Sequence, residues 1–118
     1  MTKLDFDTLD EDGYPTDDLL DYIEHYNIIK GSALELIKIV YDNWSYPYPY
    51  SHYYKDFGGQ HVGWYRVTLC TGGWSGNELL IHYLQSNKFF WTMYWQYSER
   101  GGKYQFIVDP KGKDWGDV

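Results

Sequence analysis

The stretch that decides the fold is Thr71-Gly72-Gly73-Trp74-Ser75-Gly76-Asn77-Glu78. Ser75 and Glu78 stand three residues apart, as in a capping box, where each side chain accepts a hydrogen bond from the other residue's backbone N–H. Trp74 stands where a hydrophobic staple begins, and the glycines let the chain turn sharply. We therefore predict a helix over residues 76–86, with Ser75 as its N-cap.

Strand-like segments flank this helix. Residues 62–70 alternate between apolar and polar side chains, which is typical of a strand with one buried face. Residues 89–97 alternate as well and predict a second strand, in which one set of side chains faces the core: Phe89, Trp91, Met93, Trp95 and Tyr97. The turn Arg100-Gly101-Gly102 then leads into residues 103–108, a pattern typical of a β-hairpin. We expect Gly101 or Gly102 to have a positive φ, as tight hairpin turns commonly require.

Two further helices are predicted nearer the N-terminus. Thr16 is a good N-cap for a helix over residues 16–26. Its first turn carries Asp17 and Asp18, where the helix dipole favours negative charge. Residues 32–44 repeat apolar side chains at helical spacing behind a second capping box. The short linker between the two segments predicts that these helices pack as a pair.

The elements occur in the order helix, helix, strand, helix, strand, strand. This order predicts one α+β domain over residues 1–118, with a small, mostly antiparallel sheet of about three strands packed with three helices. Residues 1–13 are acidic and are expected to form a loop or a frayed terminus. Residues 111–118 have no periodicity and are expected to form a tail.

An aromatic segment with alternating proline precedes the first predicted strand: Tyr46-Pro47-Tyr48-Pro49-Tyr50-Ser51-His52-Tyr53-Tyr54. Proline at this spacing excludes a helix or a central strand, so we predict an extended loop. Two interpretations stay open. The loop wraps the domain and covers the edges of the core with tyrosines, or it presents Tyr48 and Tyr50 to a partner.

The acidity of the chain is concentrated at its N-terminus. The net charge is −7, and residues 1–24 hold nine Asp/Glu and one Lys, whereas residues 25–118 hold eight Asp/Glu and nine Lys/Arg. This distribution argues against nonspecific binding to nucleic acid or to an anionic membrane. It suits a protein partner with a basic patch, and the candidate contact residues are Asp10, Glu11, Asp17 and Asp18.

The sequence also predicts a cytoplasmic location. Cys70 is the only cysteine, so an intrachain disulfide is impossible, which suits a reducing compartment. The N-terminus is acidic and has no apolar segment of the kind found in a secretory leader. No apolar run approaches the length of about 18 residues that spans a membrane.

Catalytic and metal-binding patterns are not evident in the sequence. The segment Gly73-Trp74-Ser75-Gly76-Asn77 resembles a nucleophile elbow, but its fifth position is not glycine, and the predicted cap already explains Ser75. A buried strand position suits Cys70 better than nucleophilic catalysis. The four histidines are not at metal-ligand spacing, and neither a phosphate-binding loop nor a dinucleotide fingerprint is present. The prediction is a protein that is not an enzyme and holds neither metal nor cofactor.

The remaining candidate is a ligand-binding site at the start of the central helix. A helix N-terminus offers backbone N–H groups and the positive end of the dipole to an anion. The side chains expected around a nucleotide-like anion are Trp74, Ser75, Asn77, Trp91, Trp95 and Arg100. The alternative is that the tryptophans belong to the core and that Arg100 is a solvated turn residue.

The segments 71–78 and Arg100-Gly101-Gly102-Lys103-Tyr104 resemble those of a family of small uncharacterised proteins from bacteria and their phages. The segments Asp12-Gly13-Tyr14-Pro15-Thr16 and Phe90-Trp91-Thr92-Met93-Tyr94-Trp95 are similar too, whereas the tyrosine and proline segment departs from that pattern. The resemblance implies a compact cytosolic protein carried by a phage or another mobile element. It implies no catalytic residue.

Two functions are therefore expected. The first is a binding protein that inhibits or sequesters a macromolecule, and its most concrete version is an accessory or counter-defence protein of a phage. The second is a protein that binds a small nucleotide-type anion at the start of the central helix.

Overall fold

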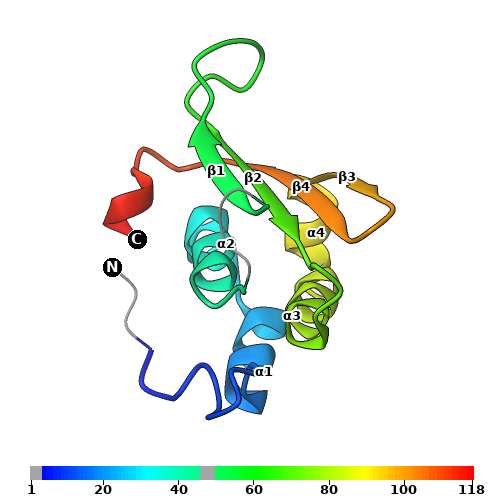
Figure 1. Cartoon of the computed structure of the whole chain (residues 1–118). Helices are drawn as coiled ribbons and strands as arrows, with labels where there is room; N and C mark the ends of the chain where they lie inside the picture. The colour runs from blue at the N-terminus through cyan, green and yellow to red at the C-terminus, as the bar shows by residue number, and fades with distance from the viewer. Residues whose placement is uncertain (1–3, 46–49) are drawn as a thin grey trace.

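The computed structural model describes residues 4–45 and 50–118 (Figure 1). The helices are α1 (Asp17–His25), α2 (Ala33–Asp42), α3 (Ser75–Ser86) and α4 (Lys88–Tyr94), with a 3₁₀ turn η1 (Trp115–Asp117). The strands are β1 (His52–Lys55), β2 (Tyr65–Cys70), β3 (Trp95–Glu99) and β4 (Lys103–Val108). The predicted α+β class is confirmed, but the described residues form four strands and four α-helices where three of each were predicted.

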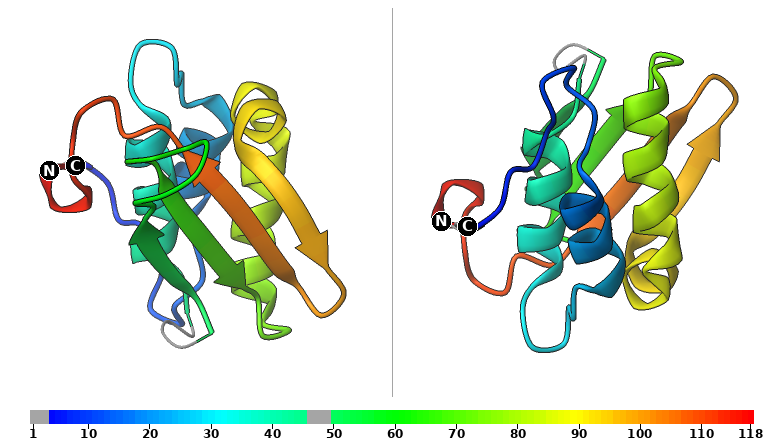
Figure 2. Two further views of the ribbon diagram at one scale, coloured as in Figure 1. Left: turned by 90° about the horizontal axis from the view of Figure 1, so that it is seen from above. Right: turned by 90° about the horizontal axis from the view of Figure 1, so that it is seen from below.

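The sheet is antiparallel throughout and has the strand order β1-β2-β4-β3. The helices gather on one of its faces (Figures 1 and 2). The two central strands supply Val67, Leu69 and Phe106, which are fully buried against those helices. Because β2 and β4 are adjacent in the sheet but separated along the chain by α3, α4 and β3, the core joins both halves of the sequence into one unit.

The first two helices begin where their caps predict. The hydroxyl of Thr16 accepts from the backbone N–H of Leu19 at 3.2 Å, and the hydroxyl of Ser32 accepts from that of Glu35 at 3.0 Å. In the second box the backbone N–H of Ser32 donates to the hydroxyl of Tyr26, at 3.1 Å, in place of the expected Glu35 carboxylate. Each cap satisfies an N–H group that the first turn of a helix leaves without an intrahelical partner.

The prediction for the aromatic segment was wrong at its end, where His52–Lys55 form strand β1. Its residues pair antiparallel with β2, and β1 lies at the edge of the sheet. Proline is excluded from central strands because it cannot donate to a neighbour, but prolines that precede an edge strand remove no ladder bond. Tyr48, one of the predicted partner-binding residues, lies outside the described residues.

The predicted strand over residues 89–97 was wrong for residues 89–94, which belong to helix α4. The buried side chains are Phe90 and Tyr94, one helical turn apart, whereas Phe89 and Met93 are 66% and 59% exposed. This is the reverse of the predicted faces. A short apolar run fits both a helix and a strand, so alternation alone could not decide between them.

Asn87 joins the end of α1 to the start of α4. Its side-chain oxygen accepts from the backbone N–H of Phe90 at 3.3 Å and so caps α4. Its side-chain nitrogen donates to the backbone oxygens of Ile23, at 3.0 Å, and Tyr26, at 2.9 Å. Two carbonyl groups at the end of α1 are therefore hydrogen-bonded to Asn87, the N-cap of α4.

Both ends of the described chain pack against the domain. In the N-terminal loop, one carboxylate oxygen of Asp10 accepts from the backbone N–H groups of Asp12 and Tyr14, each at 2.9 Å. The expected tail contains η1, whose Trp115 is buried and stacks on Tyr53 with ring centroids 3.8 Å apart. Residues 4–13 thus form a loop, as predicted, with an ordered turn, whereas the C-terminal residues are part of the fold.

None of the helices in the described ranges is long and apolar enough to cross a lipid bilayer.

Candidate functional site

The start of α3 differs from the predicted capping box. The N-cap is Trp74, which makes no side-chain cap hydrogen bond, and Ser75 is the first helical residue. The hydroxyl of Ser75 lies 2.9 Å from the hydroxyl of Tyr14 in the N-terminal loop. Gly72 and Gly73 both have a positive φ, of 62° and 76°, and complete the turn one residue earlier than expected. Ser75 therefore fastens the N-terminal loop to α3.

The ring of Trp74 lies over the first turn of α3. A Cβ atom at Gly76 would overlap this ring, so the helix start has room for the indole only because position 76 is glycine. The ring of Tyr14 also lies beside the indole, with centroids 5.0 Å apart. The helix start that was predicted to receive an anion is thus packed against aromatic side chains.

Asn77 has a structural role. Its side chain is fully buried. The oxygen accepts from the backbone N–H of Ser45 at 2.9 Å, and the nitrogen donates to the backbone oxygens of Ser45, at 3.0 Å, and Thr71, at 3.1 Å. Both N–H groups of the amide are used, and no part of the side chain faces solvent. Its placement among the ligand-binding residues was therefore wrong, because the amide holds two loops together.

The two remaining tryptophans of the predicted site belong to the corner between α4 and β3. The rings of Trp91 and Trp95 are stacked, with centroids 5.9 Å apart and planes 14° apart. Trp91 also contacts the ring of buried Phe106 edge-on at 5.4 Å. The indole N–H of Trp95 donates to the hydroxyl of Ser98 at 2.8 Å. Trp91 therefore packs against the core, as in the alternative, whereas Trp95 is 39% exposed.

The two glycine turns meet, as the ligand hypothesis requires. Arg100 is exposed at the tip of the β3–β4 hairpin, and Gly101 and Gly102 have φ values of 95° and 86°, which confirms the predicted positive φ. The backbone oxygen of Gly102 accepts from the N–H of Thr71 at 3.0 Å. The hairpin turn is therefore bonded to the segment that leads into α3.

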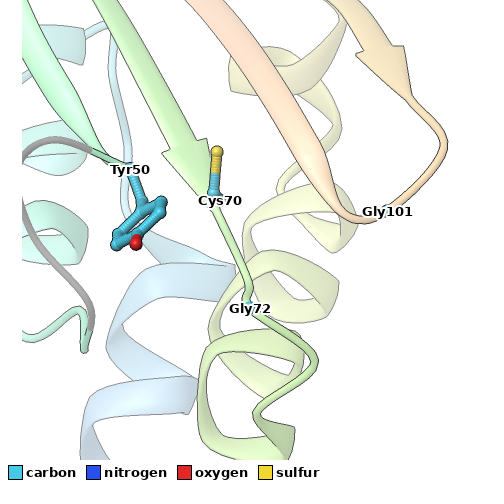
Figure 3. A pocket seen from close by; sticks show the side chains of 4 residues that line it. All are labelled: Tyr50, Cys70, Gly72 and Gly101. Carbon is cyan, nitrogen blue, oxygen red and sulfur yellow. The ribbon is translucent and has the colours of Figure 1, made fainter.

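A cavity of about 460 Å³ opens beside this junction and is lined by Tyr50, Cys70, Gly72 and Gly101 (Figure 3). Tyr50, a predicted partner-binding residue, is 65% exposed here. The pKa of the Cys70 thiol is raised, mainly by burial. The charge of Glu99 also raises this pKa, and the opposing effect of Lys103 does not reverse the shift. Since the thiolate is the nucleophilic form, these surroundings do not activate Cys70. The cavity offers space and polar backbone, and sequence reasoning did not place Tyr50 and Cys70 in it.

The predicted acidic surface is present on α1. Four carboxylates share one face of this helix, and we call them the acidic row: Asp17, Asp18, Asp21 and Glu24. Together with Leu20 of the same helix and Tyr83 of α3, they line a hollow of about 320 Å³. Asp21 pairs with the ring of His25 at 3.3 Å. Within the described ranges, the other three make no ion pair with Lys or Arg.

Asp10 and Glu11, the predicted partner-binding residues of the N-terminal loop, have different surroundings from the carboxylates of α1. Asp10 uses one carboxylate oxygen inside its own turn, so its role is partly structural. Glu11 is exposed beside it. Asp21, Glu24 and His25 have side-chain atoms within 4.8 Å of one another and could hold a metal ion, although exposed acidic groups commonly gather in this way without one.

Sequence reasoning missed a patch of exposed apolar side chains. Ile29, Phe89 and Met93 are 70%, 66% and 59% exposed, and we call them the apolar patch. Phe89 and Met93 line a hollow of about 410 Å³ with Lys88 and Thr92. Phe89 and Ile29 also line a second hollow, of about 240 Å³, that includes Glu24 of the acidic row. The exposed apolar side of α4 could have been recognised in the sequence only if residues 88–94 had been assigned to a helix.

Comparison of the chain with protein-family models, curated proteins and solved structures finds no match in any of the three.

Proposed function

We propose that this chain is a binding protein that holds, and thereby inhibits or sequesters, a protein partner with a basic patch. The acidic row carries the proposal. Asp17 and Asp21 stand four residues apart on α1, where like charges repel, and Asp21 and Glu24 stand three apart. A cationic partner relieves this repulsion, and the negative charge of the acidic row guides that partner toward the surface. The resemblance noted above makes a phage accessory or counter-defence protein the most concrete version.

The role proposed for the acidic row predicts a kinetic effect. In the variant Asp17→Asn/Asp18→Asn we expect slower association with the partner, while dissociation changes less, because exposed charges mainly steer the encounter. The partner is first recovered by affinity capture from lysate of the producing cells, and its binding kinetics are then measured at two salt concentrations. The effect should shrink at high salt, since mobile ions screen exposed charges.

The matched control is Glu99→Gln, which removes an exposed carboxylate at the end of β3, an edge strand of the sheet. The slowing of association is compared per carboxylate removed. Equal slowing in both variants would show that net charge alone acts. Association that does not depend on salt would contradict the proposal.

A second candidate function is binding of a nucleotide-type anion in the cavity between Tyr50 and Gly101. The observation that favours it is the contact between the two glycine turns, which places Gly72 and Gly101, the residue after Arg100, around one cavity. With ATP as the probe, isothermal titration should then detect binding that Arg100→Ala weakens at least tenfold. Since Arg100 is exposed, the melting temperature should stay the same. Equal affinity in the variant, or no binding by the unmodified protein, would exclude this function.

A further inference from the structure

The apolar patch is one continuous feature of the surface. Phe89 and Met93 lie one turn apart on α4, so their side chains are neighbours on the same helix face. Ile29 joins them because it lines a hollow together with Phe89. Contiguous apolar surface is uncommon on monomeric proteins and marks interaction sites when polar residues surround it. The core does not need these side chains, since Phe90 and Tyr94 supply the buried face of α4.

The apolar patch and the acidic row adjoin. Glu24 lines the hollow of the acidic row, and it also lines the hollow that contains Phe89 and Ile29. Figure 2 shows the end of α1 next to α4, in the view from below. Lys88 and His25 line the apolar hollows as well, but the carboxylates outnumber them along α1. The combined surface therefore presents apolar side chains at one end and negative charge at the other.

This combination selects among the possible occupants. Anionic lipid headgroups and nucleic acid phosphates would be repelled by the acidic row. A protein helix with apolar side chains on one face can place them in a hydrophobic groove. If Lys or Arg side chains flank that apolar face, they meet Asp17, Asp18 and Glu24, which make no ion pair with Lys or Arg among the residues described here.

We infer that the acidic row and the apolar patch form one docking surface for an amphipathic, basic helical segment of a partner protein. The inference rests on the proposed function and adds to it an apolar anchor site, centred on Phe89. The acidic row guides and orients the segment, and burial of the apolar patch slows its release.

Three synthetic 18-residue peptides test this surface. The first carries Leu on one helix face and Lys on the other, the second has Glu in place of Lys, and the third has Ser in place of Leu. Each is labelled, and its binding to the full chain is followed by fluorescence anisotropy. We expect the Leu/Lys peptide to bind at least tenfold more tightly than either of the others.

Two variants show whether the apolar patch is the site. Phe89→Ser/Met93→Ser should weaken binding of the Leu/Lys peptide at least tenfold. The matched control is Phe57→Ser, which removes an 82% exposed phenylalanine from the loop between β1 and β2 and should leave binding unchanged. All the changed side chains are exposed, so circular dichroism melts should confirm that both variants fold.

The outcomes separate this inference from the proposed function. Equal binding of the Ser/Lys peptide overturns the apolar anchor while the basic partner stands. Equal binding of the Leu/Glu peptide overturns the role of the acidic row, and with it the proposed function. Loss of binding in Phe57→Ser, or no loss in Phe89→Ser/Met93→Ser, overturns the location. Dimerisation in sedimentation, or binding to phosphatidylserine vesicles, that depends on Phe89 would assign the surface to a second copy or to a lipid and would overturn the inference.

Discussion

Replacing Gly102 by alanine is expected to destabilise the protein by about 3 kcal/mol, which would lower the melting temperature by about 10 °C. Two costs combine. A residue with a Cβ atom pays about 1–2 kcal/mol to adopt the left-handed conformation that φ of 86° represents. The new Cβ atom would also overlap the hydroxyl of Thr71, and such overpacking costs about 1–3 kcal/mol.

Gly101→Ala is the control for this prediction. Gly101 has φ of 95°, but a Cβ atom there meets no heavy atom within 4 Å, so only the backbone cost of about 1–2 kcal/mol applies. Urea melts of both variants give the comparison. Adding Thr71→Ala to Gly102→Ala should recover part of the loss by removing the overlapping hydroxyl. Equal losses of stability in the two variants would show that the overlap with Thr71 does not destabilise the protein.

Replacing Asn77 by aspartate is expected to cost about 3–4 kcal/mol at neutral pH, as the loss of a partner in a buried polar network does. The new carboxylate keeps the acceptor for the N–H of Ser45. It loses both donors, however, and faces the backbone oxygens of Ser45 and Thr71. A buried carboxylate beside two carbonyl groups is a negative charge without compensation.

The Asn77→Asp variant should also acquire a dependence of stability on pH. Burial and the two carbonyl oxygens raise the folded-state pKa of the new carboxyl above its unfolded value, which is about 3.9. The variant is therefore least impaired below about pH 4 and loses stability as pH rises through the folded-state pKa. Melts across this range test the sign. Asn27→Asp is the control, because Asn27 is exposed and its side-chain oxygen accepts from the N–H groups of Ile29 and Lys30, an acceptor role that a carboxylate keeps.

Local signals made part of the fold predictable. Thr16 and Ser32 cap helices because a cap depends on side chains and backbone within one turn. The two glycines after Arg100 marked the hairpin for the same reason, since positive φ is a property of the turn itself. The acidic row was recognised in part, because Asp17 and Asp18 are close in sequence as well as in space.

The errors arose where a distant partner decides the structure. Ser75 was predicted to be an N-cap, but the helix begins one residue earlier. The hydroxyl of Ser75 is instead hydrogen-bonded to the hydroxyl of Tyr14 from the N-terminal loop. Asn77 resembled a ligand residue because its partner Ser45 lies 32 positions away. Strand β1 depends on pairing with β2, which no local pattern near the prolines reports. The apolar patch followed from the helical period of α4 and was hidden by an alternation that fitted a strand equally well.

The position of Asn87 has a consequence for the thermodynamics of association. Its amide holds the last turn of α1 and the first turn of α4 in a fixed relation, so the helix with the carboxylates and the helix with Phe89 cannot shift independently. Binding surfaces that must be ordered at the moment of contact lose conformational entropy, and that loss lowers affinity. Here the two halves of the docking surface are already set by folding. The entropy lost on association would then come mainly from the partner segment.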